Sequence, residues 1–354
     1  MTAFGLGTFG DVTVDDSGAP TSEAQTIRDV VDQAVLADEL GVDAIALGEH
    51  HREDYAISAP EVVLGAIAAR TERILLATGV TVLSSDDPAR VYEKFATLDA
   101  VSHGRAEVQL GRGSFTESFP LFGFDLAQYE QLFEEKLDLF SHLLDEDAVT
   151  WQGTLRPPLV DQQVYPKTES GRLRAWVGVG GSPQSVVRAA HYRIPLMLAI
   201  IGGQAQRFAP YVDLYHRALD QYGYDRLPVG VHSPGHIAET DEAAREQLWP
   251  HFRANRDRIG RDRGWPPVTR DVYEHEVDEG ALYVGSPETV ARKMAATVAA
   301  LGLDRFDLKY SSGPMPHSQL MDSIRLYGET VIPRVRELLA TESEPAPVSA
   351  SVPA

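Results

Sequence analysis

Eight short apolar runs recur along the chain, and each is followed by a segment of helical periodicity. Short apolar runs predict buried strands, whereas apolar residues spaced three and four apart predict amphipathic helices. Strict alternation of the two favours a parallel α/β architecture, and eight such units predict a (β/α)8 TIM barrel. The predicted strands are Phe4–Thr8, Asp43–Leu47, Ile74–Leu83, Arg105–Leu110, Arg174–Val179, Leu196–Ile201, Pro228–Ala238 and Phe306–Tyr310.

Polar residues mark where several of the predicted helices begin. Ser22 precedes Gln25 with the spacing of a capping box. Asp87 and Ser182 each precede a proline, the residue favoured in the first helical turn. We therefore expect Ser22, Asp87 and Ser182 to cap the amino ends of three helices.

The length of 354 residues fits one large barrel or two smaller domains. Two doubly wound domains would need a boundary, and the candidate is the proline-rich stretch 145–171. We instead interpret this stretch as an insertion after strand four, and 259–281 as an insertion after strand seven, both in the role of lids. The expected organisation is one barrel domain over residues 1–340, followed by a disordered tail over 341–354.

The charge balance excludes some classes of partner. Lys and Arg number 32 against 52 Asp and Glu, a formal net charge of −20. Nucleic acids and anionic membranes attract basic surfaces, so neither is an expected partner. The chain has no cysteine, which excludes disulfides, thiolate zinc sites and cysteine nucleophiles. No signal peptide and no long apolar span is recognisable, so we expect a cytoplasmic protein.

The second predicted strand ends in Glu49-His50-His51. Active sites of TIM barrels lie at the carboxyl ends of the strands, so a histidine here can act as an acid or base on a bound ligand. Adjacent residues of a strand point to opposite faces, which predicts that only one of the two enters the barrel mouth. The alternative is a pair of loop histidines bonded to backbone. A metal-dependent barrel would need His-x-His, because alternate residues share a face, and here the two histidines are adjacent. The spacing therefore argues against a metal-dependent hydrolase.

Two glycine-rich strand ends favour anion binding. Gly111 and Gly113 flank Arg112 and precede Ser114, which presents a guanidinium to a phosphate or carboxylate. The alternative is a surface arginine in a turn. The fifth strand leads through 178–185 into a helix, where free N–H groups and the helix dipole meet a glycine-rich loop. This loop also reads simply as a capped helix start, and both interpretations can hold together.

The third predicted strand contains Gly79 and Val80. A glycine inside a central strand weakens the strand and often marks the close approach of a ligand; a bulge is the alternative. Lys309 on the last strand can reach the mouth or pack its stem along the barrel.

The ordered set of motifs resembles the bacterial-luciferase family of flavin-dependent monooxygenases over about residues 3–340. The strongest part of the resemblance joins an Asp-Pro, a Leu-Asp, a Ser-x-Gly-Arg and a Gly-x-Gly motif. In that order they lie at 87–90, 98–99, 102–105 and 111–113. The Glu-His-His motif lies at 49–51, the Ser-x-x-Ser phosphate loop at 182–185 and a late Val-Gly-Ser-Pro at 284–287.

The resemblance implies reduced FMN as co-substrate or bound cofactor and oxygen insertion through a flavin hydroperoxide. It also implies site residues. His50, with His51 as the fallback, matches the proposed acid or base, and Gly79 and Val80 would lie beneath the flavin ring, where the family often has a non-proline cis peptide bond. The implied cofactor-binding set is Gly79, Val80, Gly111, Arg112, Ser114, Gly181, Ser182, Ser185 and Ile200, with Ile201 beside Ile200.

Two departures from the family pattern are visible. Asp87 stands where many members have a histidine before the proline, and Gly111 stands where luciferase has a reactive cysteine. Any flavin chemistry here therefore works without that thiol. The resemblance further implies a small organic substrate, molecular oxygen, a separate flavin reductase and a homodimer. Hydride transfer with a deazaflavin (coenzyme F420) and a non-catalytic flavin-binding barrel are the alternatives, and the sequence does not identify the substrate.

Overall fold

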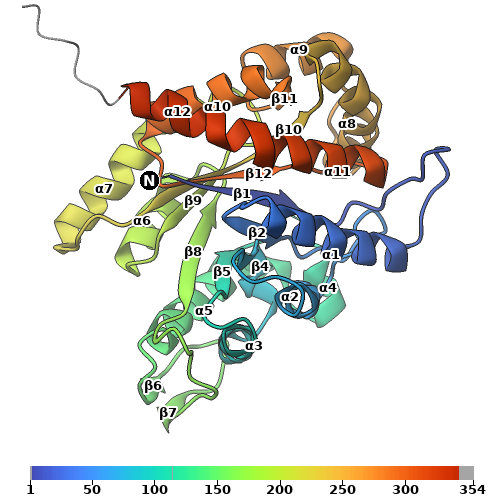
Figure 1. Ribbon diagram of the computed structural model, residues 1–354. Helices are drawn as coiled ribbons and strands as arrows, with labels where there is room; N and C mark the ends of the chain where they lie inside the picture. The colour runs from blue at the N-terminus through green and yellow to red at the C-terminus, as the bar shows by residue number, and fades with distance from the viewer. Residues whose placement is uncertain (1, 114, 343–354) are drawn as a thin grey trace, which may run out of the picture.

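Parallel strands surrounded by helices form the body of the protein in the computed structural model, which describes residues 2–113 and 115–342 (Figure 1). Within these residues the strands run in the order β3-β2-β1-β12-β10-β9-β8-β5-β4, with β11 added to β10. The bounds are β1 Ala3–Thr8, β2 Ala44–Leu47, β3 Leu75–Thr78, β4 Thr81–Val82, β5 Glu107–Gly111, β8 Arg174–Val179, β9 Leu196–Ala199, β10 Val229–Ile237, β11 Tyr283–Gly285 and β12 Arg305–Lys309.

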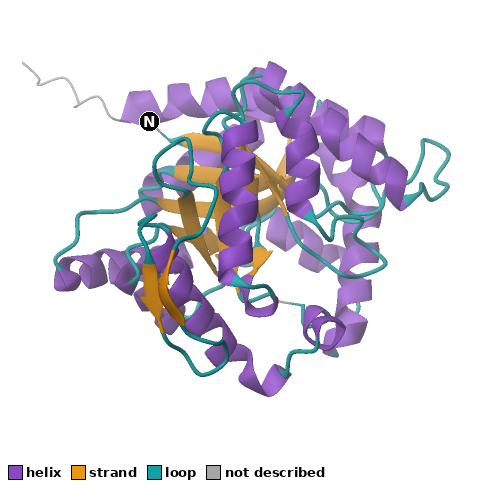
Figure 2. Cartoon of the chain, turned by 90° about the horizontal axis from the view of Figure 1, so that it is seen from below, coloured by secondary structure: helices purple, strands orange, loops and turns teal. Residues whose placement is uncertain are grey.

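The sheet nearly closes into a barrel. The β3 end of the path meets the chain just before β5, where Leu76 and Ala106 form an isolated parallel bridge and the Leu76 amide donates to the Arg105 carbonyl at 2.9 Å. Figure 2 shows the strands enclosed by helices. The predicted TIM barrel is confirmed.

Helices follow the strands, as the alternation predicted. Ser22, Asp87 and Ser182 cap α1, α3 and α6, each accepting a hydrogen bond from a first-turn amide, so the three predicted caps are confirmed. The bounds are α1 Glu23–Glu39, α2 Pro60–Ala68, α3 Pro88–Val101, α4 Ser118–Phe122, α5 Tyr129–Leu143, α6 Pro183–His191, α7 Ala209–Tyr222, α8 Asp241–Arg263, α9 Arg270–Asp278, α10 Pro287–Leu301, α11 His317–Leu326 and α12 Ile332–Glu342. Short 3-10 turns lie at Leu83–Ser85, Leu126–Gln128 and Ala205–Phe208, and a π-helical turn, Tyr327–Val331, joins α11 to α12.

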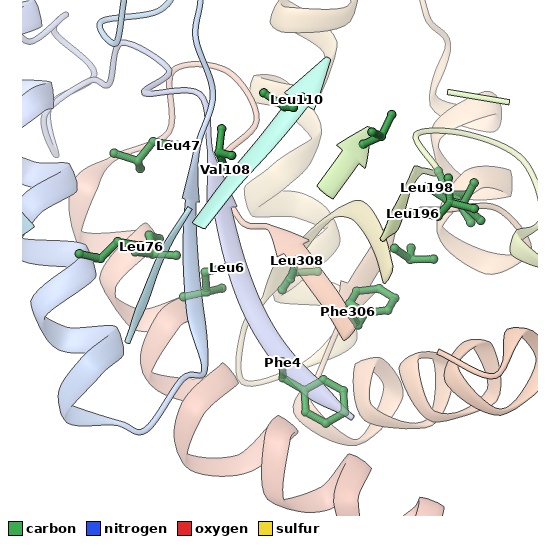
Figure 3. Close-up of a cluster of buried hydrophobic side chains, with 14 of the residues drawn as sticks. Phe4, Leu6, Leu47, Leu76, Val108, Leu110, Leu196, Leu198, Phe306 and Leu308 are labelled. Carbon is green, nitrogen blue, oxygen red and sulfur yellow. The ribbon is translucent and has the colours of Figure 1, made fainter. Parts of the chain in front are cut away.

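The main apolar core lies between the strands and the outer helices. Alternate strand residues such as Phe4, Leu6, Phe306 and Leu308 are fully buried in it (Figure 3). Residues between them face the barrel interior, because side chains alternate along a strand. One of these is Gly5, where a Cβ would overlap the Asp307 carboxylate. The barrel interior around Gly5 therefore holds small and polar groups, whereas the main apolar packing lies outside the strands.

One predicted strand differs in its bounds, and the two regions predicted as insertions hold regular structure. The predicted strand Ile74–Leu83 is interrupted, because β3 ends at Thr78 and β4 begins at Thr81. In the region 145–171 an antiparallel hairpin, β6 Val149–Trp151 and β7 Leu159–Gln162, projects from the barrel (Figure 1). The region 259–281 holds the end of α8 and all of α9. The predicted tail begins within α12, and its residues 343–354 lie outside the described part of the chain. No helix among the described residues is both long enough and apolar enough to span a bilayer.

Candidate active site at the carboxyl ends of the strands

A small cavity of about 60 Å³ lies at the carboxyl ends of β2 and β3. Its wall combines polar groups with aromatic rings, and the loops after β1, β2 and β5 supply most of it. The lining residues are Phe9, Glu49, His50, His51, Gly79, Val80, Val82, Gly113, Phe115, Glu117 and Ser118. Four predicted site residues, His50, His51, Gly79 and Val80, are thus brought together where a TIM barrel holds its chemistry.

The His50 ring is held in an aromatic cage. Its centroid lies 4.6 Å from Phe9, 4.5 Å from Tyr55 and 5.0 Å from Phe115. Its Nδ1 lies 3.8 Å from Glu117 Oε1. Burial raises the pKa of Glu117, whereas its contacts with His50 and with backbone amides lower that pKa. The lowering contacts outweigh burial, so the net pKa is below the ordinary value. The cage thus pairs one histidine with a carboxylate that stays ionised at neutral pH.

His51 is fixed by a different carboxylate. Its Nε2 lies 3.1 Å from Glu49 Oε1, and Glu49 Oε2 accepts a hydrogen bond from the Val82 amide at 2.8 Å. Both histidines line the cavity, so the expectation that only one enters the mouth is wrong. The physical reason is that β2 ends at Leu47, and strand alternation does not extend into the loop that carries the two histidines.

Gly79 and Val80 occupy the gap between β3 and β4, and the peptide bond between them is cis, as the resemblance implied. The Val80 side chain packs into space left by two glycines on neighbouring strands. A Cβ at Gly111 would overlap Val80 Cγ2, and a Cβ at Gly178 would lie 2.9 Å from Val80 Cγ1. The two glycines therefore let β5 and β8 accommodate a branched side chain inside the barrel mouth.

The amino end of α6 forms the second part of the rim. The Ser182 hydroxyl caps the helix by accepting from the Ser185 amide at 3.4 Å. The Ser185 Oγ is buried, and it has no hydrogen-bond partner among the described residues. Buried hydroxyls are normally hydrogen-bonded, so this one is free for a ligand atom. Gly181 precedes the cap with a φ of +108°, a conformation that favours glycine.

Arg112 is linked to α6 by the Glu130 carboxylate, which it shares with Arg188 of that helix. Arg112 Nη1 and Arg188 Nη2 both pair with Glu130 of α5, the second at 3.6 Å. Arg188 also pairs with Glu134, and its buried Nη1 lacks a partner within the described part of the chain. Two guanidinium groups and one unpaired hydroxyl thus gather beside a helix amino end, a set that suits a phosphate. Sequence reasoning missed Arg188 because its place depends on which face of α6 meets α5.

The predicted cofactor residue Ile200 directly follows β9. Ile200 is fully buried, with its amide donating to the His232 carbonyl at 2.9 Å, whereas the neighbouring Ile201 is 69% exposed. Ile201, not Ile200, therefore presents its side chain to the surface after β9. Ser114 lies outside the described residues.

The segment 259–281 reaches this site at the end of α8. Arg52, in the loop after the histidines, pairs with Asp262 at 2.9 Å, and the Arg263 guanidinium lies 4.9 Å from the centre of the Phe115 ring. The β6–β7 hairpin instead contacts α5, where the Thr154 amide donates to Glu135 at 2.8 Å. One of the two predicted lids thus touches the aromatic cage. The cage residues Phe9, Tyr55, Phe115 and Glu117 carried no sequence motif, because only the folded loops bring them to His50.

An α/β barrel that carries at one mouth a histidine pocket lined by aromatic rings, and beside it a cluster of anion donors (Arg112, Ser182, Ser185 and Arg188, here called the cradle), has the layout of a barrel enzyme. The model of the luciferase-like monooxygenase family matches residues 7–305, and the chain belongs to this family. It is 31% identical over 234 residues to N-acetyl-S-alkylcysteine monooxygenase of Bacillus subtilis, a match spanning 64% of this chain and 65% of that protein, just under two thirds of its length. It is 28% identical over 263 residues to 4-hydroxyprotoasukamycin monooxygenase of Streptomyces nodosus, covering 70% and 71%.

Solved structures agree on the fold. Monooxygenase RslO1 of Streptomyces bottropensis superposes with a TM-score of 0.80 at 26% identity, over 94% of this chain and 99% of that one. The oxygenating constituent of 3,6-diketocamphane monooxygenase from Pseudomonas putida, in complex with FMN, superposes with a TM-score of 0.75 at 19% identity, over 94% of this chain and 99% of that one. An F420-dependent secondary alcohol dehydrogenase gives 0.72 at 18% identity over 95% and 99%. The expected monooxygenase class agrees with the names of the relatives.

Proposed function

We propose that the protein is an FMN-dependent monooxygenase acting on a small organic molecule with molecular oxygen. One observation carries the proposal: the anion donors of the cradle and the histidine–carboxylate pocket share one mouth of the barrel. Val80 connects them, because it lines the pocket and its side chain also packs against Gly111, the residue before Arg112. A ligand with a phosphate at one end and a flat ring at the other spans such a pair of sites.

The residues at the cradle fit the FMN phosphate. Arg112, Ser182, Ser185 and Arg188 would hold it, and the unpartnered Ser185 Oγ and Arg188 Nη1 supply two donors ready for anionic oxygens. Glu130 now neutralises both arginines and is 61% exposed, so it can swing into water when a phosphate takes its place. The ring would lie against Gly79 and Val80. When bound, reduced FMN supplies the electrons that activate oxygen.

The protein's own groups would manage protons and water. His50 would exchange a proton with the bound ligand, and the Glu117 carboxylate, 3.8 Å from its Nδ1, would stabilise positive charge on the ring. The rings of Phe9, Tyr55 and Phe115 exclude water around it, and this protects a reactive site from side reactions. His51, held by Glu49, is the second candidate acid or base.

A deazaflavin-dependent hydride transfer is the second candidate function. It is supported by the F420-dependent structural neighbour, whose fold is the same. Both cofactors carry a phosphate, so the cradle alone does not discriminate between them. The named monooxygenase relatives favour the first candidate. We also propose a separate flavin reductase as the source of reduced FMN, and a homodimer.

Titration of the purified protein with FMN, riboflavin and F420 tests the proposal. We expect FMN to bind more tightly than riboflavin by about tenfold or more, because only FMN carries the phosphate. Ser185→Ala and Arg112→Gln should weaken FMN binding and leave riboflavin binding unchanged, whereas the control Ser141→Ala, on α5 away from the rim, should change neither.

The reaction itself is tested with FMN kept reduced by an added flavin reductase, ¹⁸O₂, and a panel of thioethers and cyclic ketones. Product carrying one ¹⁸O atom, lost in His50→Ala, supports the proposal. Binding of F420 in clear preference to FMN would overturn it in favour of hydride transfer. FMN binding without turnover of any panel member, and without accelerated oxygen consumption, would favour a non-catalytic flavin-binding barrel.

A further inference from the structure

The opposite end of the barrel holds a larger cavity. An open pocket of about 470 Å³ lies at the amino ends of β8, β9 and β10, the face away from the histidines. This volume is in the range of small-molecule sites, about 300–1,000 Å³. None of the residues discussed for the candidate active site lines it. In TIM barrels this face normally serves stability, so a pocket of this size needs its own explanation.

The pocket reaches the floor of the barrel interior. Glu107 and Trp176 line it, and both belong to inward-facing positions. Glu107 pairs across the barrel with Arg305 of β12, a strand that is not a neighbour of β5 in the sheet. Such a contact has to cross the interior, so the pocket reaches the Glu107 side of this buried ion pair.

Arg305, the partner of Glu107, carries an unsatisfied donor. Its side chain is only 3% exposed and it pairs with Glu107 and Asp307, yet its Nη2 has no hydrogen-bond partner in the described part of the chain. Its guanidinium carbon lies 5.7 Å from the centre of the Trp176 ring, which lines the pocket. A buried guanidinium nitrogen without an acceptor is costly, and a ligand oxygen or a bridging water would satisfy it.

The rim of the pocket is cationic although the chain is strongly acidic. Arg172, Arg174 and Arg193 line it. Arg174 and Arg193 have no carboxylate partner among the described residues: the first donates to the Gly104 carbonyl at 2.6 Å and the second lies over the Tyr224 ring. Arg172 pairs with Asp145 in an exposed contact at 2.8 Å, which contributes little and exchanges easily.

The rest of the wall is apolar. Leu173, Ala175 and Ile194 present buried side chains to it, beside the Trp176 ring. An apolar wall with a few convergent cationic groups selects a flat, apolar molecule that carries one negative charge. We propose that this pocket is a second ligand site, separate from the flavin site, for a small aromatic carboxylate. The carboxylate would meet the rim arginines while the ring packs along the apolar wall toward Trp176.

Calorimetric titration with 2-naphthoate, and with the neutral 2-naphthylmethanol as matched probe, tests this inference. We expect one equivalent of naphthoate to bind, tighter than the alcohol by about tenfold or more, because charge-assisted hydrogen bonds are stronger than neutral ones. The double variant Arg174→Gln/Arg193→Gln should weaken naphthoate binding by about tenfold or more and leave the alcohol unchanged. Leu227→Trp, which fills the pocket from its rim, should weaken both probes.

The charge-matched control is Arg90→Gln/Arg292→Gln, two exposed arginines on α3 and α10 that should leave both affinities unchanged. Saturating FMN should not displace naphthoate, so the result does not depend on the proposed function. Absence of saturable naphthoate binding, equal loss in the control variant, or displacement by FMN would each overturn the inference.

Discussion

His232 offers a sharp test of the polar barrel interior. The residue lies on β10, its ring stacks on Phe9 at 6.1 Å between centroids, and it is almost fully buried. Burial, and then the positive charges of Lys309 and Arg305, lower its pKa from 6.5 to about 4. A histidine in the unfolded chain takes up a proton near pH 6.5, so between that pH and 4 the unfolded state binds more protons than the folded one.

Acid therefore lowers the free energy of unfolding through this ring. The stability that depends on a neutral His232 is present in full above pH 6.5 and is lost as the pH falls toward 4. The two pKa values differ by about 2.5, and one pKa unit corresponds to about 1.4 kcal/mol, so the full loss is about 3 kcal/mol. Between pH 7 and pH 5 this one ring removes about 2 kcal/mol of the free energy of unfolding.

The perturbation is His232→Asn, which keeps a polar side chain and cannot titrate in this range. Urea unfolding followed by tryptophan fluorescence at pH 7 and pH 5 gives the pH-dependent loss for each protein. We expect the variant to lose about 2 kcal/mol less than the wild type between these pH values, whatever its absolute stability. His103→Asn is the control, because the His103 side chain is 87% exposed and its removal should leave the slope unchanged. Equal slopes for wild type and His232→Asn would refute the reasoning.

Three further predictions concern packing, charge and capping. Gly111→Ala should weaken FMN binding by about tenfold or more while far-UV circular dichroism stays unchanged, because the new Cβ pushes Val80 out of place in a tight core. Arg305→Met should lower the free energy of unfolding by about 3–5 kcal/mol in urea, since it leaves two buried carboxylates without a cation, whereas Glu107→Gln should cost clearly less. Asp87→Ala should lower the melting temperature by removing a cap worth about 1 kcal/mol, and helix α3 should exchange its first amides faster.

Local chemistry made much of the fold predictable. Strand and helix positions followed from apolar periodicity, and the three caps followed from residue type and spacing, because both signals act within a few residues of the chain. The break at Gly79 and Val80 was not predicted, since an uninterrupted Thr- and Val-rich run reads as one strand. The glycine itself was singled out as unusual, and the structure places the interruption there.

The candidate site was predictable only where one strand end carried its own motif. The histidine pair and the Ser-x-x-Ser loop are local, and they fall on two strand ends of the same barrel mouth. Glu117 and Arg188 were missed, because each acquires its role from a contact with another element: Glu117 meets His50 across 67 positions, and Arg188 meets Glu130 across 58. Periodicity contains no information about which loops meet above a barrel.

The buried ion pairs bear on how so acidic a chain would hold the two proposed anionic ligands. Arg305 at the floor of the barrel and Lys309 near its mouth lie four residues apart on β12. Inside the barrel Arg305 pairs with Glu107 and Asp307, and Lys309 pairs with Asp11. Surface carboxylates are screened by salt over about 8 Å at physiological ionic strength, whereas buried charges are screened much less. An anion at either end of the barrel therefore responds to the nearby guanidinium and amide donors more than to the net charge of −20. Glycines at inward-facing positions such as Gly5 make this arrangement possible, because the charged side chains occupy the space that a Cβ would fill.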